Sequence, residues 1–271
     1  MLTNMKKELK ESYKKKQAIP QFNINNLEWT KFILEECQKE NTPVILGVSE
    51  SAIEYMGGYN TVTNLVKSLI KDLNITIPVS IHLDHGSSLE SCIKAIKSGF
   101  TSVMLDLSKQ PLEINIAETK KLVEKANNNV LVEAEIGPIG TTNNNDNYTK
   151  IKDCKKLIET NIDLLAPAIG NKHGIYEGQA KLDYILLEEI NKLNIPLVLH
   201  GASGLPDEEI KKCVKLGMAK INFNTDLQLA WSKKVKQYIE ENNNVYDPRK
   251  IIKSGEKALK ETIDEKLKLL K

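Results

Sequence analysis

The feature that most constrains the fold of this chain is a regular alternation of short β-rich runs with longer amphipathic stretches. We predict strands in eight runs, at residues 18–23, 43–49, 78–84, 102–106, 130–136, 164–168, 196–200 and 220–224. We predict helices at residues 27–40, 60–73, 88–97, 112–126, 151–160, 183–194, 206–216 and 226–242. Eight successive strand–helix units favour an α/β fold, a (β/α)8 TIM barrel, over a doubly wound sheet, because no glycine-rich dinucleotide turn follows the first strand.

The length of 271 residues fits one such barrel, and no change in composition marks a domain boundary. We expect a single domain whose barrel spans about residues 17–245, with C-terminal helices at about 247–271 packed on it. The segment YDPRK at 246–250 predicts the start of this extension, because Asp247 suits a helix N-cap and Pro248 the first helical position.

Charge and hydropathy exclude several classes of protein. The formal net charge is only +2, so no basic excess indicates binding to nucleic acid or to an anionic membrane. The charged N-terminus lacks an apolar leader, and no apolar run approaches the roughly 20 residues of a membrane-spanning helix. The cysteines form no CxxC pair and lie in helical patterns, which favours free buried thiols at Cys37, Cys92, Cys154 and Cys213. These features predict a soluble cytoplasmic protein.

The predicted strands end in polar side chains. Active sites of (β/α)8 barrels gather at the C-terminal ends of the strands, and a barrel built only for stability needs no polar residues there. The polar strand-end residues are Asn23, Ser49, Asp84, His85, Asp106, Glu135, His200, Asn222 and Asn224. The sequence therefore predicts an active site on this rim.

Three of the four histidines fall on the same rim. His85 follows the third predicted strand, His173 lies in the loop after the sixth, and His200 closes the seventh. Three imidazoles with an open fourth position are typical ligands of a catalytic Zn²⁺ ion. The alternative is three unrelated histidines, each satisfied by hydrogen bonds. Glu135 is either a further ligand or a carboxylate that supports one.

Strand alternation separates His82 from the other two functional groups of the segment SIHLDHGSS at 80–88. Ser80, His82 and Asp84 share the face that we expect to line the barrel interior, while the apolar residues between them face the helices. We expect His82 to be an interior, hydrogen-bonded histidine. Asp84, at the open end, suits general acid–base work or the orientation of a ligand histidine.

Two loops have the composition of a phosphate site. HGASGLP at 200–206 follows the seventh strand, and INFNTDLQ at 221–228 follows the eighth and leads into a helix. Such loops, with a helix N-terminus, form the recurring phosphate site of these barrels. The same residues also fit a glycine–serine turn and a helix N-cap. The candidates for phosphate contact are Gly174, Gly201, Ser203, Gly204 and Thr225.

A set of segments from about Gln17 to the C-terminus carries a family resemblance. In order they are FNINNLEW, GVSESAIEYMGGY, HLDHGSSLESCIKAIKSGFTSVMLD, EAEIG, LAPAIGNKHGIY, LVLHGASGLP, INFNTDLQ and DPRK. Together they are far more specific than any single motif. The chain resembles the class II, zinc-dependent fructose-bisphosphate aldolases, in the bacterial ketose-bisphosphate aldolase group.

The resemblance implies reversible aldol cleavage of fructose 1,6-bisphosphate to dihydroxyacetone phosphate and glyceraldehyde 3-phosphate in glycolysis. It also implies a homodimer or homotetramer. One Zn²⁺ ion would be held by His85, His173 and His200, with Glu135 near the metal. Asp84 would transfer the proton of the hydroxyl group at the carbon–carbon bond that is cut.

The resemblance assigns further residues to the substrate. The phosphate of dihydroxyacetone phosphate would bind to Gly174, Gly201, Ser203, Asn224 and Thr225. Asn222 would hold the reacting part of the substrate. The rest of the substrate and the second phosphate would be contacted by Asn23, Ser49 and Arg249, the only arginine in the chain. A monovalent cation, Na⁺ or K⁺, near the phosphate loops is a further family feature.

One departure from the family concerns the loop after EAEIG. Relatives have a glutamate there that moves the proton on the dihydroxyacetone-phosphate carbon, whereas this chain has Thr141 and Thr142 where acids are expected. Asp146 is the only carboxylate inside the loop, so either Asp146 substitutes or another group or water moves that proton. Glu177 also stands where relatives commonly have a lysine near phosphate.

These departures leave alternatives. Tagatose 1,6-bisphosphate, or another ketose bisphosphate, is the main alternative substrate, although the segment NFNTD favours fructose. From a different class, the chain could be a non-catalytic phosphosugar-binding barrel or an aldolase partner subunit. A zinc hydrolase is disfavoured because the carboxylate-rich cluster for a second metal is absent.

Overall fold

The computed structural model describes residues 1–140, 148–174, 176 and 181–271. Its centre is a closed barrel in which each strand pairs in parallel with the next and β8 pairs with β1. The strands are β1 (Ile19–Asn23), β2 (Val44–Ser49), β3 (Val79–Gly86), β4 (Ser102–Leu105), β5 (Leu131–Ile136), β6 (Leu164–Pro167), β7 (Leu197–Leu199) and β8 (Met218–Phe223). The predicted TIM barrel is confirmed, with strand ends shifted by a few residues.

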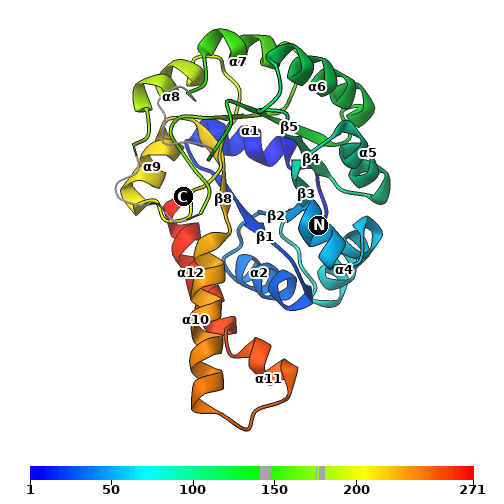
Figure 1. The fold of residues 1–271 in the computed structure, drawn as a ribbon, viewed down its shortest axis with the longest axis vertical. Coiled ribbons are helices and arrows are strands. Elements are labelled where there is room, and N and C mark those ends of the chain that lie inside the picture. Colours follow the sequence, from blue (N-terminus) through cyan, green and yellow to red (C-terminus); the bar gives the residue numbers. More distant parts are fainter. Residues whose placement is uncertain (141–147, 175, 177–180) are drawn as a thin grey trace.

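Helices surround the barrel, and each of the eight predicted helices is present (Figure 1). They are α2 (Leu27–Lys39), α4 (Tyr59–Asp72), α5 (Leu89–Ser98), α6 (Leu112–Ala126), α7 (Ile151–Ile158), α8 (Tyr184–Asn191), α9 (Asp207–Lys215) and α10 (Thr225–Glu241). A further helix, α3 (Glu50–Tyr55), follows β2 and is capped by the Ser49 side chain. Its six residues are too few to produce a helical period in the sequence.

The sequence analysis did not predict the first helix, α1 (Lys6–Lys15). Leu9 is the only buried residue of α1, and Leu9 and Tyr13 are the only apolar residues in its sequence, too few to mark an apolar stripe. Met5 and Leu9 pack against inward-facing residues near the N-terminal ends of the strands, including Ile19 and Ile45. The N-terminal segment therefore fills the bottom of the barrel, which the predicted start near residue 17 left out.

The C-terminal extension consists of α11 (Pro248–Lys253) and α12 (Glu256–Leu269), as predicted. Asp247 caps α11 with its side chain, and Pro248 occupies the first turn. Figure 1 shows α10 and α11 projecting away from the barrel, while α12 runs back along α10. The carbonyl of Leu270 accepts a hydrogen bond from the backbone of Ala18, which ties the end of α12 to the start of β1.

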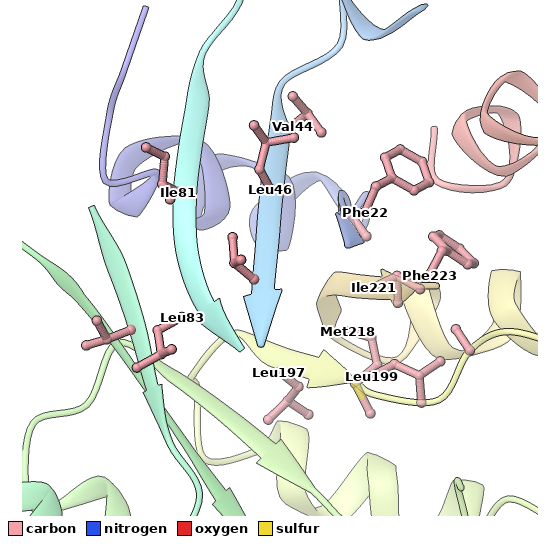
Figure 2. Close-up of a cluster of buried hydrophobic side chains, with 14 of the residues drawn as sticks. Phe22, Val44, Leu46, Ile81, Leu83, Leu197, Leu199, Met218, Ile221 and Phe223 are labelled. Atoms are coloured by element: carbon pink, nitrogen blue, oxygen red, sulfur yellow. The ribbon is translucent and has the colours of Figure 1, made fainter. Parts of the chain in front are cut away.

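The two faces of the barrel sheet differ in character. Outward-facing side chains such as Leu46, Ile81 and Leu83 join one large apolar cluster with the surrounding helices (Figure 2). Inside, apolar residues fill the lower half, whereas polar residues occupy the upper half. The fully buried polar residues include Gln21, His82, Glu133 and Lys220. The predicted alternation along β3 is confirmed, because His82 is buried and hydrogen-bonded through Nδ1 to Ser102 Oγ at 2.6 Å.

All four cysteines are buried and unpaired, as predicted. Burial, with a smaller contribution from Glu50, raises the pKa of the Cys92 thiol to about 12. Among the residues that the structure describes, no helix is long and apolar enough to cross a membrane.

Replacing Leu9 with alanine should lower the free energy of unfolding by about 2–5 kcal/mol, because it leaves a cavity where α1 fills the barrel. Urea unfolding followed by circular dichroism measures this change. Ile185→Ala is the matched control, since Ile185 is 78% exposed and should alter stability by less than about 0.5 kcal/mol. Equal stability of the two variants would contradict a packing role for α1.

Candidate active site

The end of β3 is built so that two consecutive side chains face the cavity. His85 has a left-handed backbone with φ of 54°, and the pairing of β3 with β4 shifts register between Leu83 and Gly86. Under strict alternation Asp84 and His85 would point to opposite faces of the strand. The bulge re-aims His85, so both residues line the same cavity. Gly86 is required here, because a Cβ would lie 2.6 Å from the Met104 carbonyl oxygen.

The three rim histidines converge, as the sequence predicted. One ring nitrogen from each of His85, His173 and His200 lies within 4.8 Å of the others. The ring centroids of His85 and His200 are 4.6 Å apart, and those of His85 and His173 are 4.9 Å apart. The alternative of three unrelated histidines on separate hydrogen bonds does not fit this cluster.

Carboxylates on the outer side of two rings determine which nitrogens face the centre. His85 Nδ1 lies 2.8 Å from Asp106 Oδ2, and His200 Nε2 lies 2.7 Å from Glu133 Oε1, so both nitrogens donate to carboxylates. The opposite nitrogens, His85 Nε2 and His200 Nδ1, then meet at 3.0 Å. Two lone pairs this close require a positive charge between them.

In the metal-free protein a proton supplies this charge. Burial disfavours the charged ring, but the hydrogen bond to Asp106 and the charge of Asp84 outweigh it and raise the pKa of His85 to about 9. Burial and the neighbouring imidazoles lower the pKa of His173 to about 4, so its lone pair is free. The donor set of two convergent ring nitrogens and a third neutral imidazole fits a Zn²⁺ ion, which would take the place of the proton.

Glu135 lies on the other side of His85. Its Oε2 is 3.8 Å from His85 Nδ1, the nitrogen that bonds Asp106, and Oε2 has no hydrogen-bond partner among the described residues. Burial and the charge of Asp106 raise the pKa of Glu135 to about 8, so its carboxyl group is protonated at neutral pH. His85, Asp106 and Glu135 form a second group of converging ligand atoms. Glu135 is therefore placed to support His85 rather than to complete the histidine cluster.

Asp84 presents a free oxygen to the cavity. Its Oδ2 accepts a hydrogen bond of 2.7 Å from Asn23 Nδ2, while the buried Oδ1 has no partner among the described residues. Although burial opposes ionisation, the charges of His85, His200 and Lys220 keep the pKa of Asp84 well below its usual range. Asp84 is thus a carboxylate with one oriented oxygen and one oxygen available to a ligand.

A cavity of about 230 Å³ at this rim collects most of the predicted site residues. Its lining consists of Asn23, Ser49, Asp84, His85, His173, Gly174, His200, Gly201, Ser203, Asn222, Asn224 and Thr225. Every one of these was predicted from the sequence. Gly201 allows a close approach of two loops, because a Cβ there would lie 2.1 Å from the Lys172 carbonyl oxygen.

The N-terminus of α10 opens into this cavity. Asn224 makes no side-chain cap, and Ser203 Oγ instead accepts hydrogen bonds from the backbone N–H groups of Asn224 and Asp226. The Asp226 side chain accepts from Gly204 N at 3.1 Å and lies 2.8 Å from Lys266 Nζ of α12. The C-terminal helix therefore braces the loop and helix end that would receive a phosphate.

The structure does not place three of the residues singled out in the sequence at this cavity. Asp146 and Glu177 fall outside the described residues. Arg249 lies on α11, where its exposed side chain pairs with Asp247. The neighbouring Lys250 lines a groove with Tyr238, so α11 packs at the far end of α10, about 20 Å from Thr225 at 1.5 Å per residue. Within one chain, Arg249 does not reach the cavity.

Asp106 was predicted only as a polar strand end, and Glu133 and Lys220 were not predicted. In the structure Asp106 and Glu133 accept hydrogen bonds from His85 and His200, and Lys220 donates to Glu133. Alternation could have revealed two of them, because Glu133 and Lys220 each lie two residues before a predicted interior site residue on the same strand.

A second groove, of about 670 Å³, adjoins the cavity and shares Asn23, Ser49, Asn224 and Thr225 with it. Aromatic residues, Trp29, Tyr55 and Trp231 among them, form part of its wall. Among the described residues that line the groove or the cavity, there is neither a lysine nor an arginine.

Comparisons with known proteins agree with this geometry. Residues 3–271 match the family model described as fructose-bisphosphate aldolase class-II. The fructose-bisphosphate aldolase of Geobacillus stearothermophilus is 50% identical over 98% of this chain and 96% of that protein. The fructose-bisphosphate aldolase of Staphylococcus aureus strain Mu50 is 49% identical over the same shares.

Solved structures support the same relationship. The crystal structure of the YdjI aldolase from Escherichia coli K12 has a TM-score of 0.87 and 31% identity, covering 100% of this chain and 97% of that one. The fructose-bisphosphate aldolase from Campylobacter jejuni has a TM-score of 0.82 and 26% identity, covering 99% and 95%. This chain belongs to the class II fructose-bisphosphate aldolase family.

Proposed function

We propose that this chain cleaves fructose 1,6-bisphosphate reversibly into dihydroxyacetone phosphate and glyceraldehyde 3-phosphate. The observation that carries the proposal is the pair of convergent nitrogens on His85 and His200, 3.0 Å apart, in the same cavity as the unpartnered oxygen of Asp84. Class II aldolases are zinc-dependent. His85, His173 and His200 would hold one Zn²⁺ ion, with Glu135 behind His85. Bound Zn²⁺ would supply a Lewis acid that stabilises negative charge on the substrate's carbonyl oxygen.

Asp84 acts on the hydroxyl group next to the bond that breaks. In cleavage its free Oδ1 takes the proton of the C4 hydroxyl as the C3–C4 bond breaks. C4 then becomes the aldehyde carbon, and the electron pair of the broken bond passes to the dihydroxyacetone-phosphate half, which gains a proton at C3. The hydrogen bond from Asn23 keeps Asp84 oriented. In condensation Asp84 returns its proton to the new hydroxyl.

A different group must move the proton at C3. Asp146 is our candidate, because it is the only carboxylate in the loop where relatives have a glutamate. Two carboxylates would then divide the two proton transfers between them.

The phosphate of the dihydroxyacetone-phosphate half would bind at the N-terminus of α10. Asn224 and Thr225 lie at this end of the helix, where the helix dipole favours an anion. Gly174, Gly201 and Ser203 line the same end of the cavity, and Asn222 would hold the reacting carbons. A Na⁺ or K⁺ ion near these loops belongs to the proposal on the strength of the family resemblance. The four unpaired cysteines support a reducing, cytoplasmic location.

The second phosphate would lie in the groove beside Asn23 and Ser49. Since no described lysine or arginine lines this groove, a phosphate dianion there needs a cation from elsewhere. Arg249 stands on a projecting arm and is too far from the groove of its own chain. We assign Arg249 to the groove of a second copy of the chain in a symmetric homo-oligomer. The α11 helix of each copy would then bring its Arg249 to the groove of the other copy.

Metal removal tests the reaction. We expect the zinc-loaded protein to cleave fructose 1,6-bisphosphate, to lose this activity after thorough chelation, and to regain it with added Zn²⁺. Tagatose 1,6-bisphosphate should be assayed in parallel, because faster cleavage of it would reassign the substrate. Activity that survives complete metal removal would contradict the metal site, and a zinc-bound protein that cleaves neither sugar would be a non-catalytic barrel.

Asp84→Asn and Asp146→Asn should separate the two proton transfers. Asp84→Asn should slow cleavage by about a hundred- to ten-thousand-fold, yet still exchange the C3 proton of dihydroxyacetone phosphate with solvent. Asp146→Asn should slow that exchange. An assay of cleavage and isotope exchange followed by NMR measure the two effects. Asp72→Asn is the control, because Asp72 is an exposed residue of α4. Unchanged exchange in Asp146→Asn would eliminate Asp146 from this role.

Mixed oligomers test the placement of Arg249. Co-expressed Asp84→Asn and Arg249→Ala chains should regain activity that neither has alone, because one site of each mixed dimer keeps Asp84 from one chain and Arg249 from the other. The control pair is Asp84→Asn chains co-expressed with His200→Ala chains. It should regain no activity, since each chain then carries a defect in its own cavity and no site of the mixed dimer is intact. If the first pair also fails to recover, Arg249 does not act across the interface.

A further inference from the structure

A fully buried ion pair lies beneath the histidine cluster and has no part in the steps described above. Lys220 of β8 and Glu133 of β5 are both 0% exposed, and Lys220 Nζ lies 2.7 Å from Glu133 Oε2. A buried pair of this kind rarely adds to stability, because removing both charges from water costs about as much as their attraction returns. A contribution to stability therefore does not explain why this ion pair lies in the barrel interior.

Glu133 joins this pair to the cluster. One carboxylate oxygen, Oε2, accepts from Lys220, and the other, Oε1, accepts from His200 Nε2 at 2.7 Å. His82 Nε2 lies 3.7 Å from Oε2. The carboxylate thus has two partners. The ammonium group of Lys220 can only donate, whereas the imidazole of His200 can donate or accept.

The hydrogen bond to Glu133 determines the tautomer of His200. With hydrogen on Nε2, the lone pair of Nδ1 points toward His85 Nε2 at 3.0 Å, where the metal is proposed. Asn222 Nδ2 lies 3.2 Å from Nδ1 and 3.4 Å from Nε2, so the carboxylate of Glu133, and not Asn222, distinguishes the two nitrogens. If hydrogen moved to Nδ1, it would occupy the position that the ligand lone pair needs.

We propose that Lys220 is a positioning residue that, through Glu133, holds His200 in the tautomer with Nδ1 open toward the metal. Lys220 has only donors, so it obliges Glu133 to act as an acceptor and compensates the charge of a carboxylate that could not otherwise stay buried. The inference rests on the proposed role of His200 as a metal ligand. It makes a prediction for changes that leave all three histidines in place.

Glu133→Gln should weaken Zn²⁺ binding by about 10–100-fold. The amide of glutamine has one acceptor and one donor group, and Lys220 requires the acceptor. The NH₂ group then faces His200 Nε2, which must accept, so the hydrogen of His200 moves to Nδ1. Competition with a chelator, using metal-free protein and Zn²⁺ alone, measures the dissociation constant.

The double variant Glu133→Gln with Lys220→Met separates this role from a purely structural one. Without the ammonium group, the amide oxygen is free to accept from His200 Nε2, so Zn²⁺ affinity should return to within a few-fold of the original. Damage to packing alone would make the double variant bind no better than Glu133→Gln. Lys220→Met by itself leaves an unpaired buried carboxylate and is expected to fold poorly, so the test does not depend on it.

A spectroscopic measurement reads the tautomer directly. The chain has only four histidines, so ¹⁵N NMR of the imidazole nitrogens in metal-free protein resolves each ring. His200 should carry hydrogen on Nε2 in the unchanged protein and the double variant, and on Nδ1 in Glu133→Gln. Lys6→Met, which breaks the ion pair with Asp163 away from the cavity, is the matched control and should change neither tautomer nor affinity.

His200→Ala distinguishes failure of the inference from failure of the proposed function. If His200→Ala loses Zn²⁺ while Glu133→Gln binds it normally, or if the double variant does not recover, Lys220 has no positioning role and the metal site stands. If His200→Ala binds Zn²⁺ as tightly as the unchanged protein, the proposed metal site itself is wrong and the inference falls with it.

Discussion

Closure of the barrel by parallel pairing of β8 with β1 is the constraint on which every other feature depends. Because the strands are parallel, their carboxyl ends meet on one rim, and residues as distant in sequence as Asn23 and Thr225 line one cavity. The same closure creates an interior that must be filled. Apolar residues and α1 fill its lower half, which leaves the upper half for polar groups.

The upper half of the interior is organised for chemistry at some expense of stability. His85 adopts a left-handed backbone, which costs on the order of 1–3 kcal/mol for a non-glycine residue. Glu133, Lys220 and Asp84 are charged groups withdrawn from water. The large apolar cluster between the sheet and the outer helices offsets these costs (Figure 2). Packing outside the sheet therefore contributes stability that the polar upper interior does not. Sites that need strained or charged residues commonly have this arrangement.

Much of the site could be predicted from the sequence because strand ends are visible as the last residues of apolar runs. That logic put His85, His173 and His200 on one rim with the loops at 200–206 and 221–228, and residues of all these segments line one cavity in the structure. It did not explain how His85 faces the cavity, because alternation sends His85 and Asp84 to opposite faces and the bulge at β3 reverses this. It also missed α1, in which Leu9 is the only fully buried residue and Tyr13 packs partly buried against the same cluster. Alternation can place Glu133 and Lys220 in the barrel interior, but it does not reveal their contacts with each other and with His200, which join different strands.

The contacts of α12 have a consequence for the order in which the site matures on the ribosome. Lys266 holds Asp226 beside Gly204, and Leu270 supplies the hydrogen-bond acceptor for Ala18, which precedes β1. The backbone N–H of Ala18 therefore has this acceptor only after residue 270 has been synthesised. Because α12 follows every strand of the barrel in the sequence, the contacts that hold Asp226 beside Gly204 can be completed only after α12 has been synthesised.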